Sequence, residues 1–277
     1  MTGYLARLSQ VSAARGALCV GVDPHPGLLS AWGLESTASG LERFSRQLVE
    51  ALGEQVAVIK PQSAFFESFG SAGIAVLERL LADIRAAGAL SILDVKRGDI
   101  GSTMTAYAQA YLADGAPLSA DAITVSPFLG FGSLQPAFDL AVENGRGVYV
   151  LARTSNPEGG QVQLAQTEGH SVAQEIVDQA IAANAASGQP AIGLVIGATH
   201  QNLGCDLAAF NGSILVPGIG AQGGRMSDLP TLFGPAFGKV LPMVGRELLG
   251  SGPDRQSLRD KAVQLIGQIP DAARHDS

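Results

Sequence analysis

The chain has 277 residues, of which 46% are hydrophobic, so we expect a single domain over residues 1–277 with a sizeable buried core. A net charge of −7 without a basic stripe makes nucleic acid an unexpected partner. Cys19 and Cys205 lack the spacing of a disulfide framework or a zinc site, and no apolar stretch reaches the ~18 residues of a membrane span. Arg7 and Arg15 interrupt any secretory pattern, so we expect a cytoplasmic protein without export or membrane anchoring.

Short apolar runs rich in β-branched residues alternate with segments of helical periodicity. We expect strands at 17–22, 56–59, 90–95, 122–125, 147–151, 192–196, 214–216 and 239–244. Helices are expected at 41–52, 74–87, 104–113, 134–142 and 172–186, with an extra helix near 4–14 and a closing one near 256–269. Pro230, Gly234 and Pro235 limit any helix between the last two strands to a short one. This alternation predicts an α/β fold, a closed (β/α)8 TIM barrel.

The candidate functional residues all follow the C-terminal ends of the expected strands. In a barrel, the loops at that end build the active site. An open doubly wound sheet would also place its site at the strand ends, but the first strand leads into Gly21-Val-Asp-Pro-His-Pro rather than G-x-G-x-x-G. The barrel is therefore favoured, and the stretches 27–40 and 156–167 are expected to form loops over the site.

Asp94, Lys96 and Asp99 lie close together where the third strand ends. Positions i and i+2 of a strand face the same way, so Asp94 and Lys96 should point together while Val95 packs on the other side. Because desolvated charges are costly, such a group is retained when it is paired or functional. The cluster is either a structural ion-pair knot or an array for proton transfer, and we favour the array.

Two late loops have the composition of a phosphate site. The glycine-rich stretch 216–224 follows the seventh strand, and Gly245 and Arg246 follow the eighth. Glycine lets backbone amides approach an oxyanion, and arginine offers a bidentate fork, although ordinary glycine turns remain an alternative. Asp23 and Lys60 are expected at the same end of the barrel as these loops. Each of them alone is only weak evidence for a functional site. The four histidines are scattered, so neither a histidine metal site nor a histidine-assisted nucleophile is expected.

Residues 94–103 read Asp-x-Lys-x-x-Asp-Ile-x-x-Thr, and further matches follow one order along the chain. These are Asp23, Lys60, Ser155 in Thr-Ser-Asn-Pro, the stretch 217–224, and Val244-Gly-Arg246. Together they resemble orotidine 5'-phosphate decarboxylase, in its longer-chain bacterial (type 2) subgroup. The resemblance implies decarboxylation of orotidine 5'-monophosphate (OMP) to uridine 5'-monophosphate (UMP) in pyrimidine biosynthesis, without a cofactor or a metal.

The resemblance also implies a role for each matching residue. The catalytic residues would be Lys96, Asp94, Asp99 and Lys60, with Lys96 stabilising and protonating the carbanion on ring carbon C6. Asp23 and Lys60 would bind the ribose, Ser155 the pyrimidine, and Gln222 and Arg246 the phosphate, next to Gly223 and Gly245. Asp99 and Thr103 would reach the neighbouring subunit's site in a homodimer.

Two rival functions remain open at this point. A metal-dependent decarboxylase or aldolase acting on a keto-sugar phosphate uses a similar Asp-x-Lys-x-x-Asp to help hold Mg²⁺. The Ile-Gly-Ser-Thr extension at 100–103, together with Gln222, argues against it. A non-catalytic barrel that binds a phosphorylated metabolite is also disfavoured, since binding alone does not require so costly a cluster of charges.

Overall fold

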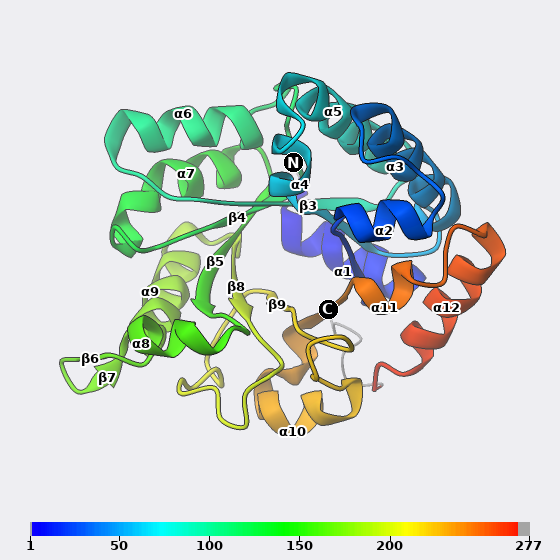
Figure 1. Cartoon of the computed structure of the whole chain (residues 1–277). Helices are drawn as coiled ribbons and strands as arrows, with labels where there is room; N and C mark the ends of the chain where they lie inside the picture. The colour runs from blue at the N-terminus through cyan, green and yellow to red at the C-terminus, as the bar shows by residue number, and fades with distance from the viewer. Residues whose placement is uncertain (1, 271–277) are drawn as a thin grey trace.

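Eight parallel strands close into a barrel in the computed structural model of this chain, which describes residues 2–270 (Figure 1). The strands are β1 (Cys19–Val22), β2 (Val58–Pro61), β3 (Leu90–Arg97), β4 (Ala122–Val125), β5 (Gly147–Arg153), β8 (Ile192–Ile196), β9 (Ile214–Val216) and β10 (Val240–Val244). β1 closes the barrel, because Cys19 pairs with Val58 on one side and with Met243 on the other. The prediction of a closed barrel is confirmed, and the open doubly wound sheet is ruled out.

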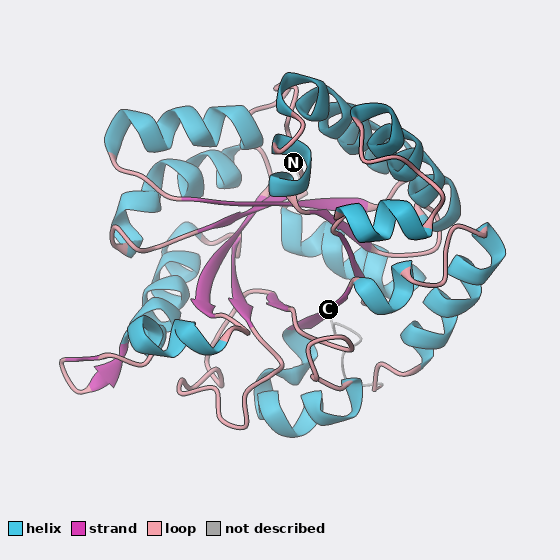
Figure 2. Ribbon diagram, in the orientation of Figure 1, coloured by secondary structure: helices cyan, strands magenta, loops and turns pink. Residues whose placement is uncertain are grey.

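Helices surround the barrel on its outside (Figure 2). They are α1 (Tyr4–Arg15), α2 (Pro26–Ala31), α3 (Ala38–Leu52), α4 (Ser63–Glu67), α5 (Gly70–Ala86), α6 (Gly101–Leu112), α7 (Gln135–Glu143), α8 (Gly160–Gln163), α9 (Val172–Ser187), α10 (Leu229–Phe233), α11 (Arg246–Leu249) and α12 (Arg255–Gly267). Short 3-10 turns lie at Phe131–Leu134, Pro157–Gly159, Met226–Asp228 and Gly234–Lys239, and β6 (Gln166–Thr167) pairs with β7 (His170–Ser171) in a small hairpin.

Alternating residues of each strand separate the core into two layers. On β3, Leu90 and Ile92 belong to the cluster inside the barrel, whereas Leu93 and Val95 pack in the layer between strands and helices. Tyr4 of α1 is part of the inner cluster and fills the N-terminal end of the barrel. Asp94 is the next residue of β3 that faces into the barrel, and it lies toward the open C-terminal end. In a barrel, this is where functional residues are found.

The predicted elements agree with the structure except at a few places. The second strand is observed at Val58–Pro61 rather than 56–59, and β3 runs on to Arg97. The stretch 27–40 was expected as a loop over the site, and this was wrong, because it contains α2 and the start of α3. Pro26 begins α2, the ring of His25 accepts a hydrogen bond from the backbone N–H of Leu28 (3.2 Å), and Trp32 is buried in the core. The expected single domain also includes residues 1 and 271–277, which lie outside the described part.

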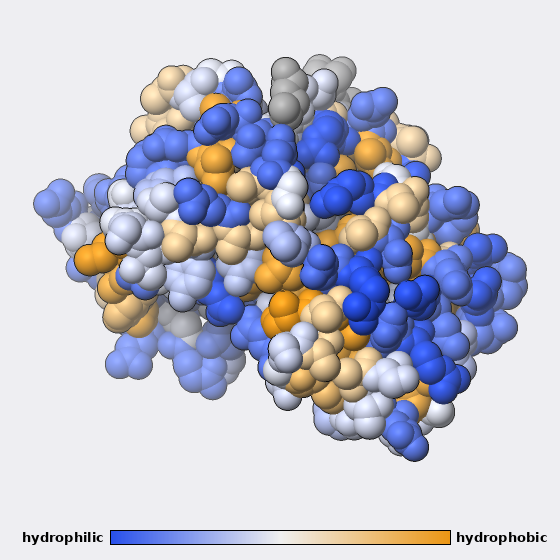
Figure 3. All heavy atoms as spheres, turned by 90° about the horizontal axis from the view of Figure 1, so that it is seen from above, coloured by the Kyte–Doolittle hydropathy of each residue, from blue (hydrophilic) through white to orange (hydrophobic). Residues whose placement is uncertain are grey.

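The surface is of mixed character. On the face shown in Figure 3, hydrophilic residues predominate and hydrophobic ones form small groups among them. None of the helices within residues 2–270 has both the length and the apolar character needed to cross a membrane.

The floor of the barrel offers a test of stability that is separate from any function at the other end. Tyr149 is fully buried, its hydroxyl lies 3.1 Å from that of Tyr4, and it donates to Ser213 Oγ at 3.0 Å. Tyr149→Phe keeps the ring but leaves these partners unsatisfied, so the free energy of unfolding should fall by about 1–3 kcal/mol. Urea denaturation measures this, and an unchanged midpoint would show that the hydroxyl network does not stabilise the fold.

Candidate active site

A pocket of about 730 Å³ opens at the C-terminal ends of the barrel strands. Its charged side chains come from three neighbouring strands, with Asp23 following β1, Lys60 on β2, and Asp94 and Lys96 on β3. Its uncharged polar side chains come mainly from β2, β4, β5 and β9 and the loops after them, and include Gln62, Thr124, Ser126, Thr154, Ser155, Asn156, Gln163 and Gln222. The pocket therefore has one charged side and one neutral side.

Asp94 is the centre of the charged side. Its Oδ2 lies 2.5 Å from Lys60 Nζ, and its Oδ1 lies 2.6 Å from Lys96 Nζ and accepts a hydrogen bond from Thr124 Oγ1 at 2.8 Å. The two lysines differ in exposure, because the Lys60 side chain is 3% exposed and that of Lys96 is 45% exposed. Both lysines line the pocket, and Lys96 is the more accessible of the two ammonium groups.

The pKa values of this group follow from a competition between burial and ion pairing. Burial disfavours the charged form of Asp94, but the charges and hydrogen bonds of Lys60 and Lys96 outweigh it and hold the pKa of Asp94 well below its usual range. Burial likewise opposes the Lys60 ammonium, yet Asp94 and Asp23 raise the pKa of Lys60 above its ordinary value. At neutral pH, Asp94 and Lys60 therefore form a buried, fully ionised pair.

Lys96 has an unusual backbone conformation. Its φ is 45°, in the left-handed region that costs a residue other than glycine about 1–2 kcal/mol. The pairing of β3 with β4 shifts register between Leu93 and Arg97, so the strand is irregular at this point. Thr124 stabilises the arrangement, because its hydroxyl accepts from the Lys96 backbone N–H at 3.0 Å while donating to Asp94. A strained residue next to an ion pair is typical of a functional site.

Thr124 is a site residue that was not expected, although its position in the sequence carries one signal. Ala122 faces the inside of the barrel, and Thr124 follows it by two positions on the same strand. A polar residue at an inward position near the C-terminal end of a strand is a candidate for the pocket.

Asp23 presents an acceptor without a partner. Its Oδ1 is buried, and no donor within residues 2–270 bonds to it. Gly245 lies beside it, since a side chain at Gly245 would begin 3.9 Å from Asp23 Oδ2. Buried acceptors are nearly always satisfied in proteins, so this oxygen is suited to a hydroxyl group of a ligand.

The neutral side of the pocket joins two loops. Ser155 Oγ donates to Gln222 Oε1 at 2.9 Å, which links the loop after β5 to the glycine-rich turn after β9. Gly220 in that turn has a φ of 75°, and a side chain there would begin 2.4 Å from Glu247 Oε2. The turn after β9 therefore packs against the loop after β10, where Arg246 begins α11 with an exposed side chain.

Five of the residues assigned by resemblance do not line this pocket: Asp99, Thr103, Gly223, Gly245 and Arg246. Asp99 Oδ1 accepts from the Ile100 N–H at 2.8 Å, and Thr103 is exposed on α6. Within one chain, the array is therefore a carboxylate between two ammonium groups, Lys60–Asp94–Lys96, and not an ammonium between two carboxylates. The chain turns out of the barrel at Gly98, where a side chain would begin 2.2 Å from the carbonyl oxygen of Ser126.

The segment after β5 covers the pocket, as expected for 156–167. Asn156, Gly159, Val162 and Gln163 contribute to its wall, and the apolar part of the lining includes Pro127, Phe128, Leu151, Val172, Ile176, Val195, Leu215 and Met243. A pocket with an apolar wall and a few convergent polar groups suits a small molecule. Within residues 2–270, no three His, Cys, Asp or Glu side chains are grouped so that they could hold a metal ion.

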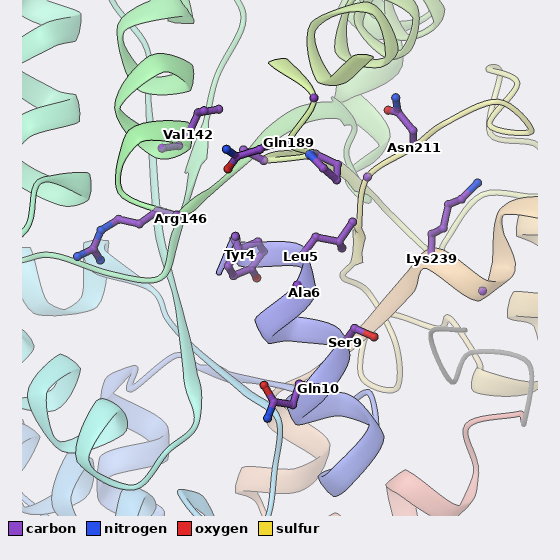
Figure 4. A pocket seen from close by; sticks show the side chains of 18 of the residues that line it. Tyr4, Leu5, Ala6, Ser9, Gln10, Val142, Arg146, Gln189, Asn211 and Lys239 are labelled. Atoms are coloured by element: carbon purple, nitrogen blue, oxygen red, sulfur yellow. The ribbon is translucent and has the colours of Figure 1, made fainter. Parts of the chain in front are cut away.

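A larger cavity, of about 1000 Å³, lies at the opposite end of the barrel (Figure 4). It is formed by α1 and by the segments that precede β5, β8, β9 and β10. Arg146 points away from α1 in this view, and its guanidinium already pairs with Asp114 at 2.7 Å. This end of a barrel serves stability, so the smaller, charged pocket is the candidate active site.

Comparison with known proteins agrees with this geometry. The family described as "Orotidine 5'-phosphate decarboxylase / HUMPS family" matches residues 16–260. The orotidine 5'-phosphate decarboxylase of Salinispora arenicola is 55% identical over 269 residues, which is 96% of each chain. That of Streptomyces coelicolor is 53% identical over 272 residues, 97% of this chain and 98% of the other.

Solved structures have the same fold over nearly the whole chain. A structure from Streptomyces avermitilis is 53% identical, with a TM-score of 0.91 over 97% of this chain and 95% of that one. The Leishmania donovani OMP decarboxylase is 30% identical, with a TM-score of 0.77 over 97% of this chain and 99% of that one. The charged pocket at the mouth of the barrel is therefore that of a member of the orotidine 5'-phosphate decarboxylase / HUMPS family, to which this chain belongs.

Proposed function

We propose that this chain is an orotidine 5'-phosphate decarboxylase, which converts OMP to UMP in pyrimidine biosynthesis. The observation that carries the proposal is the Lys60–Asp94–Lys96 array at the mouth of the barrel, in a chain 53–55% identical to decarboxylases of that name. The family name covers more than one activity, and these close relatives favour the decarboxylase over a keto-sugar-phosphate enzyme. Cys19 and Cys205 are both free thiols, which fits a reducing cytoplasm.

Lys96 is the proposed proton donor. When the bond between C6 and the carboxylate of OMP breaks, carbon dioxide leaves and an electron pair remains on C6. The ammonium of Lys96 stabilises that pair and then gives it a proton, after which Lys96 regains a proton from water. Because Asp94 fixes the ammonium at 2.6 Å, the positive charge is in place before the carbanion forms.

The other site residues bind the parts of the nucleotide that do not react. Asp23, with its unsatisfied oxygen, and Lys60 bind the ribose hydroxyls. Ser155 binds the pyrimidine, and its contact with Gln222 brings the ring and phosphate regions together. Gln222 and Arg246 hold the phosphate between the last two strand-end loops, where Gly223 and Gly245 leave room for an oxyanion.

A homodimer completes the site in this proposal. Asp99 and Thr103 lie outside the pocket of their own chain, at the start of α6. Large hydrophobic residues are exposed in the same region, with Ile100 62%, Phe128 79% and Leu129 52% exposed. Exposed hydrophobic residues that form a contiguous patch are typical of a protein interface. We infer that this face pairs with a second copy of the chain and that Asp99 and Thr103 enter the partner's pocket.

The activity and the role of Lys96 are tested together. Purified protein should remove the orotate chromophore of OMP, and Lys96→Ala should abolish turnover while keeping UMP affinity within about tenfold, ~1.4 kcal/mol. The reason is that Lys96 acts on the reacting carbon and does not anchor the nucleotide. Absorbance assays and UMP titration measure both quantities.

Lys239→Ala, which removes an ammonium at the other end of the barrel, is the matched control and should keep full activity. Lys96→Ala activity within about a hundredfold of wild type would move the proton donor elsewhere. Wild-type protein without turnover, or turnover that EDTA abolishes and Mg²⁺ restores, would refute the proposed function.

The shared site is tested by mixing variants. Asp94→Asn and Asp99→Asn homodimers should each be nearly inactive, because each site lacks one carboxylate. After subunit exchange, one site of a mixed dimer carries both substitutions and the other carries neither. With random exchange about half of the dimers are mixed, so activity should recover to at most about a quarter of the wild-type value.

Mixing Asp94→Asn with Lys96→Ala is the control for this experiment. Both residues belong to the same subunit's pocket, so every site in a mixed dimer keeps one lesion and activity should stay low. No recovery with Asp99→Asn, despite exchange demonstrated by labelled subunits, would place Asp99 outside the partner's site.

The phosphate site is tested at Arg246. Arg246→Ala should lower kcat/KM for OMP by about three or more powers of ten, ~4 kcal/mol, because it removes a charge-assisted clamp whose binding energy is used at the reacting carbon. Turnover of the unphosphorylated nucleoside should hardly change. Arg225→Ala is the matched control, since Arg225 directly follows the glycine-rich stretch 216–224, pairs with Asp228 and does not line the pocket. Equal losses for nucleoside and nucleotide would show that Arg246 does not bind the phosphate.

A further inference from the structure

Arg153, the last residue of β5, is a buried cation without a carboxylate partner. It is 6% exposed, and no acidic group within residues 2–270 lies within 4.0 Å of its guanidinium. Its Nε is buried and unsatisfied among the described residues. Buried arginines are normally paired, so a guanidinium kept in this place indicates a specific task.

The contacts of Arg153 go to two neutral acceptors on two different loops. Nη1 donates to Gln163 Oε1 at 3.2 Å, and Nη2 lies 3.3 Å from His200 Nδ1. Gln163 belongs to α8 in the segment that covers the pocket, whereas His200 follows β8. The planar fork of an arginine, with its fixed spread of donors, is suited to joining two such acceptors at once.

Gln163 closes the segment after β5 into a compact loop. Its Oε1 also accepts from the Thr154 backbone N–H at 3.0 Å, and its Nε2 donates to Thr154 Oγ1 at 2.7 Å. Gly159 allows this closure, since a side chain there would begin 2.7 Å from Thr154 Oγ1. The hydrogen bonds between Thr154 and Gln163 therefore join the two ends of the loop. Ser155 directly follows Thr154 in the chain.

The loop after β8 supports Ser155 from the other side. Because a guanidinium can only donate, His200 Nδ1 accepts, and the bonding assigns the imidazole proton to Nε2, which donates to the Thr154 carbonyl oxygen at 2.7 Å. Thr199 Oγ1 donates to the Ser155 carbonyl oxygen, also at 2.7 Å. Gly197 leaves room for this contact, as a side chain there would begin 2.6 Å from Ser155 Cα.

We propose that Arg153 and His200 are positioning residues that hold Ser155, and through it Gln222, in the geometry that binds the nucleotide. This inference rests on the proposed function, because the two residues would position Ser155 and Gln222 for the nucleotide substrate. Neither side chain lines the pocket, so both act through Thr154 and Ser155. The contact between Arg153 and His200 requires an imidazole nitrogen that accepts, since an N–H at Nδ1 would place a second donor against the guanidinium of Arg153.

Arg153→Met is the direct test, with Arg153→Lys as the matched variant that keeps the charge without the fork. Both should raise KM for OMP and the Kd for UMP by about tenfold while kcat stays within about threefold, because Lys96 and its partners are untouched. His200→Ala should have the same effect. His200→Gln should restore the wild-type KM, since its amide can both accept from Arg153 and donate to the Thr154 carbonyl.

A double-mutant cycle separates positioning from a general structural role. If Arg153 acts through Ser155, then Arg153→Met combined with Ser155→Ala should raise KM no more than Ser155→Ala alone. Tyr149→Phe, which weakens the barrel floor, should lower the unfolding midpoint and leave KM unchanged. If Arg153→Met does not fold, the contrast between His200→Ala and His200→Gln decides.

Three results would overturn the inference: a wild-type KM in Arg153→Met and His200→Ala, additive effects in the cycle, or an equal rise of KM in Tyr149→Phe. These outcomes differ from failure of the proposed function, which would appear as absence of OMP turnover in the wild-type protein.

Discussion

The buried carboxylate of Asp94 is the constraint on which the site depends. Two ammonium groups cannot lie this close without it, and the carboxylate itself could not remain ionised in the barrel without them. Its partners Lys60, Lys96 and Thr124 come from three adjacent strands, β2, β3 and β4. The register of the barrel therefore sets the distances, and a slip of one residue on β3 would turn Asp94 toward the helices.

Burial divides the work between the two lysines. Lys60 is enclosed and bound to Asp94, so its charge stabilises the carboxylate, whereas Lys96 shares the same carboxylate and faces the pocket. Thr124 connects the ion pair to the backbone, because its single hydroxyl bonds both to Asp94 and to the strained backbone of Lys96. The left-handed conformation of Lys96 is thus stabilised by the ion pair that it helps to form.

The sequence was sufficient for the barrel and for most of the charged group. Strands were recognisable because their apolar runs are buried on both faces, and Asp94 and Lys96 could be paired because they are two positions apart on β3. Thr124 was missed because a threonine in a strand is common for reasons of propensity alone. Asp99 follows the irregular end of β3, and no periodicity predicts where a side chain points after such a break. Arg153 lies beyond the expected strand 147–151, and its contact with His200 comes from a loop distant in the sequence.

The two sides of the pocket differ in chemistry and also in how rigidly they are built. The groups that would act on the reacting atom, Asp94 and Lys96, belong to a strand paired within the barrel, and stabilisation by preorganised charge is lost when the charge can move. The groups that would bind the pyrimidine and the phosphate, Ser155 and Gln222, lie on loops beyond the strand ends, and side-chain hydrogen bonds link these loops to one another. The fork of Arg153 can hold such loops from outside the pocket, so it adds no further cation beside Lys60 and Lys96 that would compete with Lys96 for the substrate carboxylate. Because this guanidinium lies behind the loop, Lys96 remains the most exposed cation on the charged side of the pocket, as the proposed chemistry requires.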